Sequence, residues 1–205
     1  GMVDAISIVA LGRVFVANMT GNVVFIGFAL AGIEGFALLP SVVAVAGFVV
    51  GALGGGTLVQ RFGRSRPILL RNALGIEFTL LAGCLVASLL VHLRQDGPVS
   101  TTVVAGVAAA AMGLQTATAR RIGVPDMTTS VVTMTLTGFA AERRRADAAL
   151  RRGAVALSML LGALGGALLL VHIGSHAGFI AVLVGVAGVG ATAALLARHE
   201  QPWHA

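Results

Sequence analysis

Apolar stretches long enough to cross a membrane constrain this chain more than any other feature. A helix needs about 20 apolar residues to cross the hydrocarbon core of a bilayer. Stretches of that order without arginine occur at 40–60, 73–93, 153–172 and 178–197. The stretch 103–119 is shorter, but it is adequate for a helix that rises about 1.5 Å per residue. Residues 1–12 supply a sixth if their helix is completed upstream, because we expect the start of the chain to be truncated.

The composition excludes an ordinary soluble domain. The chain is 57% hydrophobic and 11% charged, with a mean hydropathy of +0.96, whereas soluble domains are about 45–50% apolar and about 25% charged. All 14 basic residues are arginines, and they stand in short runs between the apolar stretches. That placement is typical of membrane-flanking anchors, so we expect no nucleic-acid partner despite the net charge of +6.

The arginines also decide how the chain threads the bilayer. The segments 13–36 and 120–142 are the ambiguous ones, and if both cross fully the arginines divide evenly between the two sides. If both are re-entrant, six crossings remain and one side keeps only Arg13 and Arg94. That asymmetry follows the positive-inside rule and puts both termini in the cytoplasm. The other side then collects Arg61, Arg64, Arg66, Arg71, Arg120, Arg121, Arg143, Arg144, Arg145, Arg151, Arg152 and Arg198. An alternative stays open, because 13–36 is apolar and long enough to cross alone.

This threading predicts the fold class. We expect an all-α, polytopic helical membrane protein with about six transmembrane helices and two broken, re-entrant segments. Each half would hold one helix, one broken piece and two more helices, in a 3+3 repeat. Because three crossings per half is an odd number, the halves would be inverted, a recurring plan of transporters. The single integral-membrane domain 1–205 would divide into halves 1–97 and 98–205.

Both ambiguous segments contain a polar cluster, "FVANMTGNVV" (15–24) and "VVTMTLTG" (131–138). Irregular backbone at membrane depth is tolerated only where protein or a water-filled cavity satisfies its polar groups. A half-helix that begins at each break would point its positive N-terminal end at an anion or a polar oxygen. The alternative is a surface turn in which Thr20 and Asn22 cap a helix. The predicted substrate-binding residues in these clusters are Asn18, Thr20, Gly21, Asn22, Thr133, Thr135 and Thr137.

Three more polar residues fall within the expected spans. Asp4 and Gln115 each precede a break at a similar distance, so both join the predicted substrate-binding set as candidate equivalents. Acidic groups at membrane depth usually face a cavity or a partner. Glu77 stands close to Arg71, and we expect it to reach water or that arginine at a helix end.

Other patterns concern packing and excluded chemistry. Glycines at four-residue spacing, at Gly47, Gly51 and Gly55 and again at Gly162 and Gly166, predict close helix contacts within the chain. We find no metal-ligand spacing among the histidines and no nucleotide-binding or nucleophile motif. We therefore expect no enzyme, no cofactor and no metal site.

Three blocks resemble a known family: "VDAISIVALGRVFVANMTGNVV" (3–24), "GLQTATARRIGV" (113–124) and "TTSVVTMTLT" (128–137). They are similar to the YoaK-like bacterial membrane proteins, also called domain of unknown function 1275. The resemblance covers nearly the whole chain and implies a bacterial inner-membrane protein with about six spans. The family is grouped as uncharacterised, so the resemblance implies a location more than an activity. Members tend to have Thr-Gly-Thr at the second break, where this chain has Met134.

The leading hypothesis from sequence is a small-solute transporter or channel with its site between the two breaks, near the middle of the membrane. The alternative is a non-transporting membrane scaffold or regulatory subunit whose polar residues serve helix packing. The expected partners are the lipid bilayer and an unidentified anionic or polar small solute. A homo-oligomer is left open.

Overall fold

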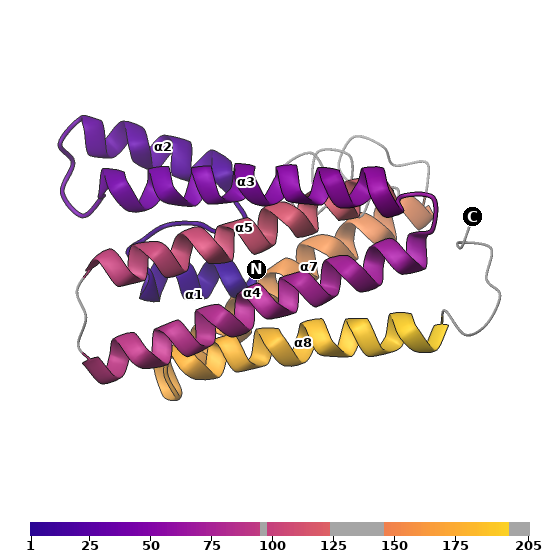
Figure 1. Cartoon of the computed structure of the whole chain (residues 1–205). Helices are drawn as coiled ribbons and strands as arrows, with labels where there is room; N and C mark the ends of the chain where they lie inside the picture. The colour runs from indigo at the N-terminus through magenta and orange to yellow at the C-terminus, as the bar shows by residue number, and fades with distance from the viewer. Residues whose placement is uncertain (95–97, 124–145, 197–205) are drawn as a thin grey trace.

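The protein is a bundle of α-helices, as a computed structural model shows (Figure 1). The structure describes residues 1–94, 98–123 and 146–196, and no strand occurs among them. Several helices run nearly lengthwise through the bundle, while two shorter ones lie at one end of it. The described helices are α1 (Met2–Ala10), α2 (Met19–Leu30), α3 (Leu38–Phe62), α4 (Arg66–Arg94), α5 (Pro98–Ile122), α7 (Ala146–His172) and α8 (Ser175–Leu196).

Five of the six predicted membrane spans are confirmed, whereas residues 1–12 contain the nine-residue helix α1, which is too short to cross alone. Five of the described helices are long and apolar enough to cross a bilayer, and each contains or largely overlaps a stretch predicted from the sequence. The largest difference is at α4, which begins at Arg66 rather than near residue 73. Pro67 suits the first turn of a helix, where a backbone N–H has no helical partner, so the helix can begin before the apolar stretch. The protein is therefore a polytopic, all-α membrane protein.

The segment between α1 and α2 does not continue in the direction of α1. Gly12 and Arg13 both adopt positive φ angles, 89° and 58°, and the chain then returns along α1 until residues 16–17 lie beside Asp4. From there α2 leaves toward the end of the bundle where α1 stops (Figure 1). The loop after α2 meets the loop after α1, because a Cβ on Gly35 would lie 2.6 Å from Arg13 Nη1. Residues 11–30 thus form a hairpin in the described structure.

The glycines of α3 bring it into backbone contact with α5. A Cβ on Gly47 would overlap the carbonyl oxygen of Gly106, and a Cβ on Gly51 would overlap that of Ala110. A Cβ on Gly55 would lie 3.2 Å from Leu114 Cα. Residue numbers rise along α3 and α5 in the same direction from contact to contact, so the two helices are parallel. Without glycines the two backbones could not approach this closely, and the predicted intramolecular role of this series is confirmed.

The second glycine series packs α7 against α1. A Cβ on Gly162 would lie 3.3 Å from the backbone nitrogen of Met2, and one on Gly166 would lie 3.0 Å from its carbonyl oxygen. These glycines stand in the middle of the span Gly153–His172, so α1 begins at middle depth in the bundle. From there α1 passes α8, where Ile6 lies against Gly178.

Arginines gather at one end of the bundle, which we call the cationic end. It is the end where α3 stops and α4 begins, where α5 stops, and where α7 begins (Figure 1). Arg13, by contrast, stands beside the loop that follows α2, and α4 stops at Arg94 at that same far end. The described arginines of the cationic end are Arg61, Arg64, Arg66, Arg71, Arg120, Arg121 and Arg151.

Candidate functional site

Asp4 fixes the extended part of this hairpin. Its Oδ1 accepts hydrogen bonds from the backbone N–H groups of Val16, at 3.0 Å, and Ala17, at 2.9 Å. Asp4 is 6% exposed, so these two hydrogen bonds are shielded from water. Ser7 adds a bond to the carbonyl oxygen of Asp4 at 3.0 Å. The Asp4 side chain on α1 therefore accepts from two backbone N–H groups that have no partner within a helix.

Asn22 fixes the same strand-like stretch from the side of α2. Its Oδ1 accepts from the N–H of Phe15 at 2.9 Å, and its Nδ2 donates to the carbonyl oxygen of Phe15 at 2.7 Å. The side chain is fully buried, and the amide replaces the backbone partner that Phe15 would have in regular secondary structure. A Cβ on Gly21 would lie 2.5 Å from Phe15 Cδ2, so glycine makes room for the aromatic ring.

Asn18 and Thr20 stand at the start of α2 and are exposed. Asn18 is the N-cap residue, but its side chain makes no cap hydrogen bond. Among the described residues, no hydrogen-bond partner of Thr20 is found either. In the described part of the chain, no side-chain acceptor is found for the first backbone N–H groups of α2. The alternative in which Thr20 and Asn22 cap the helix is wrong, since Asn18 holds the cap position and Asn22 bonds to Phe15.

Gln115 pairs with Glu77 between α5 and α4. Gln115 Nε2 donates to Glu77 Oε1 at 2.9 Å. Glu77 is 1% exposed and stands roughly 16 Å along α4 from Arg66, at about 1.5 Å per residue. The expectation that Glu77 reaches water or Arg71 at a helix end is wrong, because the side chain is buried and pairs with Gln115 instead.

The predicted site residues therefore separate into groups. Asp4 and Asn22 come together through residues 15–17, with Asn18, Thr20 and Gly21 next to them along the chain. Gln115 belongs to a second polar pair, on α4 and α5, and its partner Glu77 is the residue that sequence reasoning placed wrongly. The remaining predicted residues, Thr133, Thr135 and Thr137, lie outside the described residues.

Two of the cavities in the described part of the chain lie away from the predicted site residues. One, of about 620 Å³, lies between α4, α5 and α8, and the other, of about 440 Å³, lies along α3. Neither is lined by Asp4, Asn22 or Gln115. Within the ranges that the structure describes, no three metal-ligating side chains are grouped.

Comparisons with known proteins agree with the predicted membrane class. Residues 1–194 match the family described as "Protein of unknown function (DUF1275)". The UPF0700 transmembrane protein YoaK of Bacillus subtilis (strain 168) is 31% identical over 137 residues, which are 66% of this chain and 59% of that protein. The matched segment thus spans less than two thirds of that relative's length. No solved structure matches.

Proposed function

The chain belongs to the DUF1275 family, and we propose that it is a small-solute transporter or channel of the bacterial inner membrane. The proposed site lies at the break before α2, where it meets an equivalent break in the second half of the chain. The observation that carries the proposal is the hairpin, whose extended stretch is held at middle depth by Asp4 and Asn22. Transporters commonly bind their substrates at such interrupted helices.

Packing within the bundle supports an inverted repeat. Helix α5 packs against α3 and α4, and α1 packs against α7 and α8. In a repeat, α1 would correspond to α5, α3 to α7 and α4 to α8. Helix α5 runs toward the cationic end whereas α1 runs away from it (Figure 1), which is the relation expected of inverted halves. The residues of α3 that contact α5 and those of α7 that contact α1 also stand 111 positions apart in the sequence. A Cβ on Gly113 would meet Phe48 O and Ala52 N, and one on Gly1 would meet Met159 O and Ala163 N.

Sequence positions at the same offset support the repeat independently of the contacts. The string "GALGG" occurs at 51–55 and again at 162–166. Gly12, after α1, and Gly123, after α5, are also 111 apart, and both have positive φ angles. At this offset Asp4 corresponds to Gln115. The two polar pairs would then be equivalent parts of the two halves, and the second break would begin at Gly123.

The start of α2 provides the groups that a solute would contact. Its first N–H groups lack a side-chain acceptor, and the positive end of a helix favours an anion or a polar oxygen. Asn18 and Thr20 add exposed hydrogen-bonding groups at that point. The threonines at 133, 135 and 137 are the proposed counterparts from the second half. The cationic end is proposed to face the cytoplasm, following the positive-inside rule.

A specific observation favours the alternative of a non-transporting scaffold. Asp4 and Asn22 direct their hydrogen bonds to the backbone of residues 15–17, as packing residues do. The two functions differ in what they require of Thr20, which is exposed and for which no hydrogen bond is found among the described residues. A transporter needs the start of α2 open to a solute, and a scaffold does not.

A ligand screen separates the two functions. We would purify the protein in detergent and measure its melting temperature with a panel of small anionic and neutral polar solutes. Thr20→Val should abolish any stabilisation that the parent shows, while Thr79→Val should retain it, because Thr79 is exposed on α4 and bonds only to Gly75. Equal responses of the parent and both variants would contradict a solute site at α2.

A further inference from the structure

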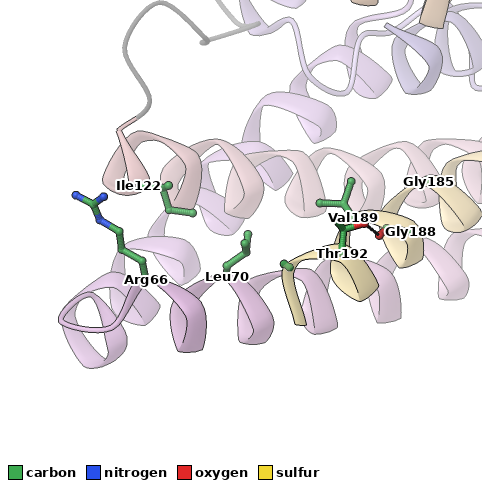
Figure 2. Close-up of a pocket in the computed structure, with 8 residues that line it drawn as sticks. Arg66, Leu70, Ile122, Gly185, Gly188, Val189 and Thr192 are labelled. Carbon is green, nitrogen blue, oxygen red and sulfur yellow. Dashed lines mark hydrogen bonds between the residues drawn. The ribbon is translucent and has the colours of Figure 1, made fainter. Parts of the chain in front are cut away.

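We propose that the cavity between α4, α5 and α8 binds one acyl chain of an anionic phospholipid, with the headgroup at Arg66. The cavity measures about 620 Å³, within the range of about 300–1,000 Å³ typical of small-molecule sites. Arg66 and Ile122 stand at one end of it, and Gly185 stands at the other (Figure 2). This inference does not depend on the proposed transport function.

The cavity exists because α8 presents glycine to it. A Cβ on Gly185 or Gly188 would meet no atom within 4 Å, so both positions border open space. Leu70 and Val189 supply apolar walls, and the hydroxyl of Thr192 bonds to the carbonyl oxygen of Gly188 at 2.8 Å (Figure 2). With that hydroxyl engaged, the walls suit a hydrocarbon and not a polar solute.

The length of the cavity along α8 is close to the thickness of one leaflet of the hydrocarbon core. Helix α8 ends at Leu196 beside the cationic end, and Gly185 stands roughly 16 Å before that end at about 1.5 Å per residue. Half of a hydrocarbon core of about 30 Å is about 15 Å. An acyl chain that starts at Arg66 would thus reach Gly185 near the middle of the bilayer.

Charge identifies the headgroup as anionic. Arg66 is the described charged residue that lines the cavity, and Arg120 and Arg121 stand in the last turn of α5, next to Ile122. The planar guanidinium group matches the geometry of a phosphate. Basic pockets between transmembrane helices on the cytoplasmic side are suited to anionic headgroups. Two features, an apolar slot and an arginine at its interfacial end, therefore point to the same amphipathic ligand.

Native mass spectrometry of the detergent-solubilised protein tests this site. We would titrate phosphatidylglycerol and phosphatidylcholine with identical acyl chains. We expect preference for phosphatidylglycerol, and Arg66→Gln should weaken its binding roughly tenfold, as loss of a charged hydrogen bond implies. Gly188→Leu should weaken both lipids, because the new side chain would fill the open space beside Val189.

Matched controls keep the test specific. Arg64→Gln removes a charge from the same end of the bundle without touching the cavity, and Gly83→Leu adds a side chain at another open glycine, on α4. Both should bind phosphatidylglycerol like the parent. The inference is overturned if Arg66→Gln binds like the parent, if Arg64→Gln loses as much, or if Gly188→Leu has no effect. It is also overturned if glycerol phosphate without acyl chains binds as tightly as the lipid.

Discussion

The contact between α3 and α5 gives a prediction with a built-in control. Gly51 and Gly54 are both in α3, three residues apart, but they face different surroundings. A Cβ on Gly51 would lie 2.6 Å from the carbonyl carbon of Ala110 and 2.7 Å from its Cα, whereas a Cβ on Gly54 would meet no atom within 4 Å. Alanine should therefore push two backbones apart at Gly51 and fit without change at Gly54.

The magnitude follows from comparing the two alanine variants. Each gains the same helix propensity of about 1 kcal/mol over glycine, so that gain cancels in the difference. What is left is the steric cost at Gly51, which overpacking data put at about 1–3 kcal/mol. For a chain of about 150–250 residues, 1 kcal/mol shifts the melting temperature by about 2–4 °C. Gly51→Ala should therefore melt roughly 2–12 °C below Gly54→Ala.

The assay is a thermal melt of each variant in the same detergent, followed by intrinsic or dye fluorescence. Gly54→Ala should melt at or slightly above the temperature of the parent. Equal melting temperatures for the two variants would refute the backbone contact between α3 and α5, and with it the packing argument for the repeat.

Three further predictions concern the polar residues and the threading. Asn22→Leu should lower the free energy of unfolding by about 1–3 kcal/mol, because the partly buried N–H and carbonyl groups of Phe15 lose their partner; equilibrium unfolding in detergent measures the change, and an unaltered value contradicts the hydrogen bonds. Gln115→Leu should cost more stability than Gln115→Leu combined with Glu77→Leu, since the single change leaves a buried carboxyl group unpaired; additive losses in the same assay contradict the pair. Reporter fusions at Gly35 and Gly63 should read opposite sides of the membrane, the second cytoplasmic, and a shared side would contradict a crossing by α3.

The sequence predicted the spans well because arginine and apolar residues obey a strong physical rule. A charged side chain in the hydrocarbon core is costly, so arginine-free stretches indicate where helices cross. The same rule, applied to the whole chain, predicted that the segment containing Arg13 is re-entrant. The start of α4 was missed because Arg66 and Arg71 were placed outside the membrane, although a helix can extend beyond the hydrocarbon core with its arginines in the interface.

The hydrogen bonds of the hairpin could not be predicted from residue types. Which backbone groups lose their partners depends on where the chain turns, and that is decided by the positive φ angles of Gly12 and Arg13. Asn22 was predicted as a solute ligand, and nothing in the sequence indicated that its amide would pair with the backbone of Phe15. Glu77 was placed by its separation from Arg71 along the chain, whereas depth along α4 determines what it meets.

Cysteine accessibility at the start of α2 tests the central claim most directly. Cys84 is the single cysteine of the chain and is buried, so Cys84→Ala gives a background without thiols. Thr20→Cys would be introduced there, with Leu53→Cys, on the exposed outer face of α3, as the lipid-facing control. In proteoliposomes, a membrane-impermeant charged maleimide should label Thr20→Cys and leave Leu53→Cys unlabelled, because water reaches the break but not the lipid face. If neither cysteine is labelled from either side of the membrane, no aqueous path reaches the hairpin and the transport proposal is contradicted.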